Sequence, residues 1–376
     1  MKIEKKTVQS GILKLEKNVQ ITIDQDMNVP DMKPDVEKIV ESRGEVHIDE
    51  VEMMTDRIRI RGMFLVQLLY LSAEKEQKIA CMEHEFALEE FMNVEGAQPT
   101  DTARVAVELE DLTISVINSR KCGVRSVLFF HIHISESKFV ECSVGVEQKE
   151  RVQCLYESEP MTEVVLYKKD IQRIRADAAL PAGRPNIREI LWNSMQLRDA
   201  DVRMMEGKLS IRGELFLFIL YESEDAQEPV QYYDWEIPFD NELECADSRE
   251  NLIGNISVTL GNHQAVIKPD EDGEPRNVEI DAVLELDLKA YREFQLPVLK
   301  DMYANDRRLI LKTRPVRFEN LIFQNNARTK VNHRVTSGTD PHRLLQVLNV
   351  EGNVKIEDFR LEEKGIATEG LIFCKV

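Results

Sequence analysis

The residues best suited to chemistry are two histidines on either side of an isoleucine. His131 and His133 lie two positions apart, so on a β-strand both side chains would share a face and could reach one metal ion. The corresponding positions of a second copy, found in the internal repeat below, hold Glu285 and Asp287. Because the residue types change between copies, we interpret this stretch as a solvent-facing polar stripe and predict no metal site.

A second candidate lies in the turn-rich stretch 269–275. Asp270, Asp272 and Gly273 resemble the start of a calcium-binding loop. The ligand series of such a loop should continue to a glutamate at its twelfth position, but here Pro275 interrupts it. A hairpin turn therefore fits this stretch better than a calcium site.

A third candidate is a cluster of acidic residues around His84. Its carboxylates are Glu83, Glu85, Glu89 and Glu90. They could act as general acids or bases, but the aligned segment 234–238 reads Asp-Trp-Glu-Ile-Pro, and a solvated strand edge fits both copies. Nucleotide-binding, zinc-protease and serine-hydrolase motifs are absent from the sequence. We predict no catalytic residues, no cofactor and no enzymatic activity.

Composition narrows the classes of partner. The 376 residues include 68 acidic and 49 basic side chains, a net charge of −19 that disfavours binding to nucleic acid or anionic lipid. No apolar run approaches the ~20 residues of a membrane-spanning helix, and the first residues do not resemble a secretory signal. The six cysteines are scattered, which indicates reduced thiols. We expect a soluble protein of two or three domains.

The elements that would position these side chains are repeated along the chain. Four residues recur 151 positions later: Pro30, Pro34, Gly62 and Tyr70 return as Pro181, Pro185, Gly213 and Tyr221. Part of a third copy follows at an offset of 308, where Gly352 and Gly370 correspond to Gly44 and Gly62. We interpret the recurring residues as determinants of turns, bends and packing, with a binding role for the tyrosines as the alternative.

A short helix is predicted after each proline turn. Val36, Ile39 and Val40 have the spacing of one apolar helical face, and Pro34 suits the first helical position. The same pattern recurs in both later copies, as Ile187, Ile190 and Leu191 after Pro185 and as Leu344, Val347 and Leu348 after Asp340-Pro341.

The remaining pattern is that of β-strands. Residues 57–70 alternate between charged and apolar types up to Gly62, which we expect to mark a bend or bulge, and are apolar on both faces beyond it. Hairpins are predicted for 105–117 with 124–134 and for 256–267 with 278–288. The fold class is therefore mainly β with short helices, in tandem repeats of a sandwich-like or barrel-like domain.

We divide the chain into three parts: residues 1–163, residues 164–326, and a truncated third repeat at 327–376. Val376 aligns with Leu68, which lies in the middle of a predicted strand. We therefore expect the chain to be a fragment of a longer protein.

Three features together resemble a known family. They are the proline turn of residues 29–40, the Ile-Arg-Gly of residues 60–62 leading to Leu69-Tyr70, and the strand 277–286. In combination they are similar to the SPOCS domain of SipL-like spore coat morphogenetic proteins of spore-forming bacteria. The resemblance covers two complete copies and part of a third. Ser337-Gly338 replaces the first proline in that third copy.

The resemblance implies a non-enzymatic scaffold in the mother cell cytoplasm, at the forespore surface, with spore coat morphogenetic proteins as partners. It also implies contact with the coat basement-layer ATPase through a LysM domain, which would lie beyond Val376; peptidoglycan would be a partner only if that domain follows. The competing hypothesis is a glycan-binding module of the cell envelope, with Trp192 and Trp235 as stacking residues. An enzymatic function is the third hypothesis.

Overall fold

The computed structural model describes the chain apart from residues 1, 75–77, 148–151, 226, 228, 317, 325–328, 335–345 and 364. All regular structure within the described residues is β, in fourteen strands. The strands of the first half are β1 (Ile3–Asn28), β2 (Val36–Met54), β3 (Arg57–Ser72), β4 (Ile79–Asn93), β5 (Thr102–Asn118) and β6 (Lys121–Val146). Those of the second half are β7 (Val152–Ala179), β8 (Ile187–Met205), β9 (Lys208–Ser223), β10 (Val230–Glu244), β11 (Ile253–Pro269), β12 (Pro275–Ala304), β13 (Glu351–Glu362) and β14 (Gly365–Lys375).

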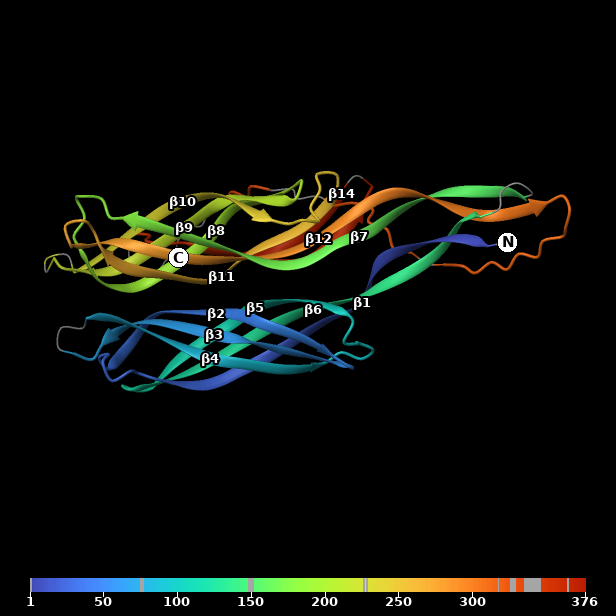
Figure 1. Cartoon of the computed structure of the whole chain (residues 1–376). Coiled ribbons are helices and arrows are strands. Elements are labelled where there is room, and N and C mark those ends of the chain that lie inside the picture. Colours follow the sequence, from blue (N-terminus) through green and yellow to red (C-terminus); the bar gives the residue numbers. More distant parts are fainter. Residues whose placement is uncertain are drawn as a thin grey trace.

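Twelve of these strands form two units of the same design (Figure 1). In unit one, β1 to β6, the sheets have the strand orders β1-β6-β5 and β2-β3-β4. In unit two, β7 to β12, they have the orders β7-β12-β11 and β8-β9-β10. All neighbouring strands are antiparallel. The predicted mainly-β repeats and both predicted hairpins, β5 with β6 and β11 with β12, are confirmed.

The core of each unit lies between its two sheets. In unit one the inward side of β3 is fully buried against the opposite sheet and includes Phe64, Val66 and Tyr70. In unit two the equivalent positions are Leu215, Leu217 and Tyr221, which are also fully buried. Every second residue of β3 faces this core, as a two-layer β-sandwich requires, whereas residues 215–221 of β9 are buried on both faces.

The predicted short helices are wrong, because their residues begin β2 and β8. Two β-bulges interrupt the pairing of β2 with β3, one between Val36 and Lys38 and one between Ile39 and Glu41. The first bulge adds a residue between Val36 and Ile39, so they lie opposite Ser72 and Tyr70 and share a face although they are three positions apart.

The short helix predicted in the second copy is also wrong, and for the same reason. Ile187 and Ile190 lie opposite Ser223 and Tyr221, with bulges after each of them. In the third copy, Asp340, Pro341 and Leu344 lie outside the described residues, and Val347 and Leu348 are exposed and form no helix.

A feature that the sequence did not indicate is an arm formed by long strand extensions. It consists of residues 3–13 of β1, 135–146 of β6, 152–163 of β7 and 291–304 of β12, which run together toward the N-terminus (Figure 1). Its small core contains Val8, Val140, Cys142, Met161 and Leu296, all buried. The arm joins the two units, and β7 runs unbroken through residues 163 and 164, where we placed a domain boundary.

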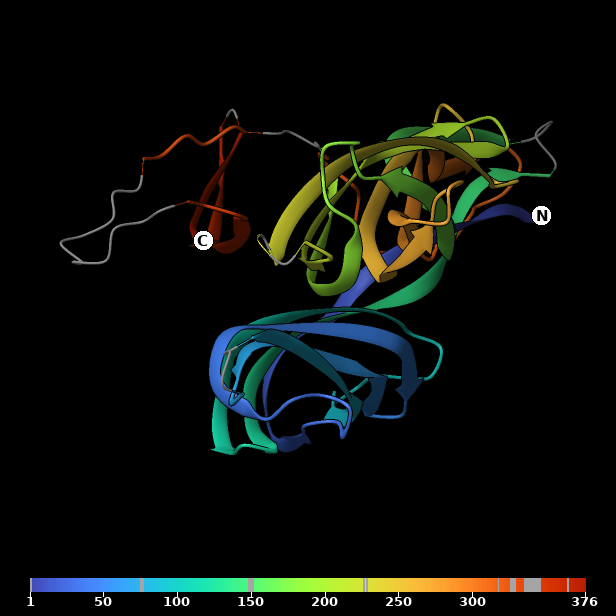
Figure 2. The ribbon, with the colours of Figure 1, turned by 90° about the vertical axis from the view of Figure 1, so that its left-hand side faces the viewer.

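The third repeat contributes the hairpin β13–β14, which belongs to neither sandwich (Figure 2) but contacts both, through Lys375 with Glu41 of unit one and Glu351 with Ser194 of unit two. Its register repeats that of β2–β3 at the offset of 308: Gly44 pairs with Val66 as Gly352 pairs with Cys374, and Ile48 pairs with Gly62 as Ile356 pairs with Gly370. The described residues contain no helix, and hence none that could cross a bilayer.

Candidate functional site

The recurring prolines and tyrosines hold each other in place. The Tyr70 hydroxyl donates a 3.0 Å hydrogen bond to the carbonyl oxygen of Pro34, and the Tyr221 hydroxyl donates a 3.3 Å bond to that of Pro185. Both tyrosine side chains are fully buried, and burial raises the pKa of Tyr70 to about 12. These residues fasten the loop before β2 or β8 to the core strand beside it.

An arginine fastens the same loop from its other side, and sequence reasoning missed it. Arg120 donates to the carbonyl oxygens of Val29, Pro30 and Lys33 at 2.8–3.0 Å. In unit two, Arg276 donates to the carbonyl oxygen of Pro181 at 2.7 Å. The loop between the last two strands of the unit differs in length between the copies, so the two arginines are not separated by 151 residues.

Three of the recurring glycines, Gly62, Gly213 and Gly370, lie where a neighbouring strand bulges. Gly62 faces the bulge between Ile48 and Glu50, and a Cβ at this position would overlap with the carbonyl oxygen of His47. A Cβ at Gly370 would overlap with the carbonyl oxygen of Lys355 in the same way. The irregularity is therefore in the facing strand, and the glycine provides the space for it.

The candidate ligands of the sequence do not converge. His131 lies on the outer face of β6, 3.1 Å from Asn18 and 3.7 Å from Glu108, and it shares that face with His133. Within the described part of the chain, no group of three His, Cys, Asp or Glu side chains could hold a metal ion. Asp270 uses its carboxylate to accept hydrogen bonds from the N–H groups of Asp272 and Glu274, as expected of a hairpin turn.

The residues around His84 lie on β4, an edge strand. Glu83, Glu85 and Glu89 are exposed there, and Glu89 forms an ion pair with Arg61 at 3.0 Å. This arrangement agrees with the predicted strand edge.

The surface that sequence reasoning missed is the seam between the two units. Its apolar part combines Leu69 of β3, Leu191 of β8, and Phe216, Phe218 and Leu220 of β9, all buried. These β9 residues point away from the core of unit two. The second apolar face of this strand therefore packs against the neighbouring unit.

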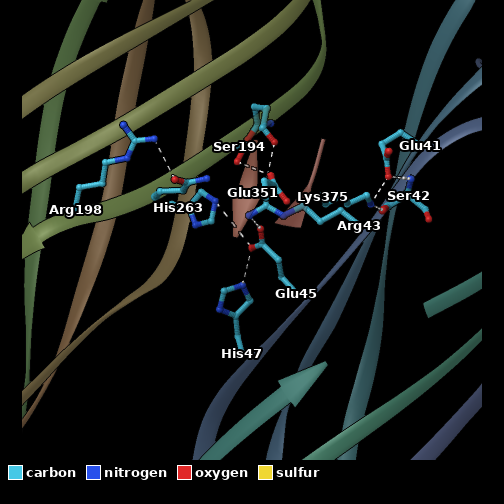
Figure 3. A network of polar contacts seen from close by, with 12 residues as sticks. Glu41, Ser42, Arg43, Glu45, His47, Ser194, Arg198, His263, Glu351 and Lys375 are labelled. Carbon is cyan, nitrogen blue, oxygen red and sulfur yellow. Dashed lines mark hydrogen bonds and ion pairs between the residues drawn. The ribbon is translucent and has the colours of Figure 1, made fainter. Parts of the chain in front are cut away.

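The polar part of the seam centres on Glu45 of β2 (Figure 3). Its carboxylate lies 2.7 Å from Arg43, 3.5 Å from the Nε2 atom of His47 and 3.9 Å from the Nε2 atom of His263, which belongs to β11 of unit two. Arg43 also contacts Glu351 of β13 at 3.5 Å. One half-buried carboxylate thus links both units, and Arg43 extends the network to the third repeat.

A cavity of about 430 Å³ opens beside this network. It is lined by equivalent residues of the two units, in four pairs 151 positions apart: Gly44 and Met195, Glu45 and Gln196, Val46 and Leu197, and Leu109 and Leu260. Around this cavity the two units therefore contribute equivalent positions.

The charged groups around Glu45 shift one another's pKa values toward the ionised forms. Burial by itself would raise the pKa of Glu45, but its hydrogen bond with His47 and the charges of Arg43 and His263 outweigh burial and lower it from 4.5 to about 2. The hydrogen bond to Glu45 raises the pKa of His47, aided by the negative charges of Glu285 and Asp49, while burial opposes the rise.

These shifts predict how the stability of the protein depends on pH. Ionised Glu45 stabilises the fold above about pH 4.5, and this contribution is lost as the pH falls toward 2. Protonated His47 stabilises it below about pH 6.5, and this contribution is lost as the pH rises through its raised pKa. We expect the urea midpoint of the wild type to fall between about pH 6 and about pH 9, and His47→Gln to reduce that fall.

His84→Gln is the matched control, because His84 lies exposed on the edge strand β4. It should retain the pH dependence of the wild type. An unchanged pH dependence in His47→Gln would contradict the role of the network.

Comparison with known families agrees with this architecture. The family model described as SipL, SPOCS domain matches residues 35–117 and again residues 186–268, which are β2 to β5 and β8 to β11. The chain is a SipL-like SPOCS-domain protein. No curated protein and no solved structure matches it significantly. The family resemblance of the sequence is thus confirmed.

Each SPOCS match covers four strands, which contain the recurring glycine and tyrosine, and begins just after the recurring prolines. Tyr70 and Gly62 lie in the first match, as Tyr221 and Gly213 lie in the second. The flanking strands β1 and β6, and likewise β7 and β12, complete the sandwich and extend into the arm. The SPOCS family indicates a sporulation-related role and is not a known family of enzymes.

Proposed function

We propose that this SPOCS-domain protein is a non-enzymatic scaffold that helps to assemble the spore coat at the forespore surface through protein–protein contacts. The observation that carries the proposal is the pair of SPOCS units with recurring residues that maintain shape. The Tyr–Pro hydrogen bond holds the proline loop against the core, and the glycine accommodates the bulge of the facing strand, so both keep the unit rigid. A surface that must hold other proteins in register benefits from such rigidity.

The partners we propose are other spore coat proteins in the mother cell. The net charge of −19 favours partners with basic surfaces and disfavours nucleic acid. Contact with the coat ATPase, or with peptidoglycan, would follow the family pattern only through a LysM domain.

The glycan-binding alternative loses support from the positions of the tryptophans. Trp192 packs against the apolar part of the seam. Trp235 packs against the core of unit two and donates a 3.2 Å hydrogen bond to the carbonyl oxygen of Ala179. Stacking on a sugar requires an exposed aromatic face, and neither tryptophan is fully exposed.

The test is deletion of the gene in its native host. We expect normal vegetative growth and spores whose coat is detached or misplaced in thin-section electron microscopy. The gene carrying His84→Ala, His131→Ala and His133→Ala should restore the coat, because a scaffold does not need these side chains. Normal coats in the deletion strain, or failure of the triple variant when it is folded and expressed, would contradict the proposal.

A further inference from the structure

Three equivalent residues, one from each repeat, meet at one point of the molecule. The Glu351 carboxylate accepts a 2.8 Å hydrogen bond from the Ser194 hydroxyl and lies 3.5 Å from the Arg43 guanidinium (Figure 3). These residues belong to β13, β8 and β2, and the repeat offsets of 151 and 308 make their positions equivalent. Equivalent positions of three units meet when the units surround a common axis, and the contacts between successive units should then correspond as well.

One contact between units one and two recurs between unit two and the third repeat. In the first case, the Cys81 Sγ atom of β4 lies 3.9 Å from the Glu189 carboxylate of β8. The equivalent residues are Tyr232 of β10 and Gln346, and the Gln346 amide donates a hydrogen bond to the Tyr232 hydroxyl. Gln346 therefore approaches unit two as Glu189 approaches unit one.

A second contact recurs between the third repeat and unit one. Arg43 donates a 3.4 Å hydrogen bond to the backbone carbonyl oxygen of Asn193 in unit two. Lys375 donates a 2.8 Å bond to the carbonyl oxygen of Ser42 in unit one, which is equivalent to Asn193. Lys375 is the cross-strand partner of Glu351, the equivalent of Arg43. A basic side chain at this place in one repeat thus holds the same carbonyl group of the next.

A third contact follows the same cycle. The hydrogen bond with Glu45 raises the pKa of His47, and the nearby charge of Glu285 in unit two adds to the rise. In the third repeat, the equivalent Lys355 lies over the Phe129 ring of unit one, 5.9 Å from its centre. Phe129 and Glu285 are equivalent, because each pairs with the same position of the neighbouring strand, β5 or β11. Unit one thus receives from the third repeat the contact that it makes to unit two.

These contacts close a cycle. Unit one contacts unit two, unit two contacts the third repeat, and the third repeat contacts unit one, each time through corresponding residues. Interfaces that join two different surfaces of successive units form a ring when the rotation closes. The junctions agree in register and differ in buried area, because Leu191 is 3% exposed and the equivalent Leu348 is 45% exposed.

We propose that the three repeats of this chain surround a pseudo-three-fold axis, with the third repeat docked as the third member of a ring. The surface that each repeat offers is the outer face of its β2-β3-β4 sheet or the equivalent sheet, and its partner is the next repeat of the same chain. Partly exposed ion pairs contribute only ~0–1 kcal/mol each, but one chain holds all three repeats at a high effective concentration. This inference does not depend on a role in the spore coat.

Carbodiimide cross-linking of the purified chain tests the ring, because this reagent joins an amine to a carboxylate that touches it. The products are identified by mass spectrometry of the monomer, which has a mass of 43.4 kDa. One cross-link should join units one and two, and two should join the third repeat to unit one. The expected pairs are Lys33 with Glu189, Lys375 with Glu41, and Lys355 with Glu110.

The decisive sample concerns the junction between unit two and the third repeat. Tyr232→Lys with Gln346→Glu places an amine and a carboxylate at the positions equivalent to Cys81 and Glu189. The ring predicts a cross-link between positions 232 and 346, with a yield like that of the first junction. Tyr303→Lys with Gln346→Glu is the matched control and should give no cross-link between 303 and 346, because Tyr303 lies on the arm and is 63% exposed. Circular dichroism confirms that both double variants are folded.

Charge exchange tests whether the third repeat is held in this register. Lys355→Glu faces Glu110 with a like charge and should lower the yield of the Lys375–Glu41 cross-link by about 3-fold. Lys355→Glu with Glu110→Lys makes the charges opposite again and should restore the yield. Lys312→Glu is the control, because Lys312 is exposed and lies outside the junctions. It should leave the yield unchanged.

Third-repeat cross-links that form only between separate chains overturn the proposal. So does a folded double variant without the cross-link between positions 232 and 346. An unchanged yield in Lys355→Glu, or a loss that the charge exchange does not restore, also overturns it. The phenotype of the deletion strain is a separate measurement, so failure of the ring and failure of the scaffold role can be told apart.

Discussion

Gly62→Ala should lower the free energy of unfolding by about 3 kcal/mol, and Gly62→Val by more. An added Cβ would overlap with the carbonyl oxygen of His47 and approach the Cα atom of Ile48 to 3.1 Å. These are backbone atoms of the bulge in β2, so they cannot move without breaking the pairing of β2 with β3. Urea unfolding followed by circular dichroism measures the loss.

The equivalent change in unit two, Gly213→Ala, should cost less, about 1 kcal/mol. The nearest atom there is the tip of the Phe239 ring at 2.7 Å, which can rotate away, and the Arg198 carbonyl oxygen lies at 3.2 Å. Gly183→Ala is the control, because a Cβ at Gly183 meets nothing within 4 Å. If Gly62→Ala lowers the free energy of unfolding no more than Gly213→Ala does, or not at all, the bulge in β2 does not restrict position 62.

Tyr70→Ala should cost about 4 kcal/mol, since it empties a fully buried aromatic position in unit one. Tyr70→Phe isolates the hydroxyl and should cost about 1 to 2 kcal/mol, because the carbonyl oxygen of Pro34 loses its 3.0 Å hydrogen bond. Tyr221→Phe should cost less than Tyr70→Phe, because its hydrogen bond is longer, at 3.3 Å.

Thermal or urea unfolding of the Phe variants measures these differences. Tyr303→Phe is the matched control, because Tyr303 is 63% exposed. A Tyr70→Phe protein as stable as the wild type would mean that the proline loop is held without this hydrogen bond.

The repeat and the strands could be predicted from the sequence, whereas the start of β2 could not. Val36 and Ile39 are three residues apart, which is a helical spacing when the chain is read without bulges. One bulge between them restores a shared face in an extended strand. Bulges are set by the pairing with β3, which is not visible in the local pattern.

The candidate site was missed for a related reason. The repeat singled out Tyr70 and Pro34 separately, but the hydrogen bond between them spans 36 residues and depends on how the loop folds over the core. The seam is harder still to predict from the sequence, because equivalent positions of the two repeats hold residues of different chemistry. Glu45 corresponds to Gln196, so comparison of the two copies gave no reason to select either residue.

The apolar pattern of β9 is visible in the sequence, but what covers each of its faces is not. The sequence is apolar on both faces beyond Gly62, and residues 215–221 of β9 repeat this pattern in the second copy. The structure places the core of unit two on one side and unit one on the other, where Phe216 and Phe218 meet the seam. A strand pattern alone does not distinguish a second sheet from a neighbouring domain.

The central claim is that the two SPOCS units are packed together as one body, and tryptophan fluorescence tests it most directly. Both tryptophans of the chain, Trp192 and Trp235, lie in unit two, so their fluorescence follows the unfolding of that unit. Gly62→Ala alters unit one alone. If the units are coupled, the urea midpoint measured by fluorescence falls in this variant together with the midpoint measured by circular dichroism. The claim would be contradicted by a fluorescence midpoint that stays at the wild-type value while circular dichroism shows that unit one unfolds at a lower urea concentration.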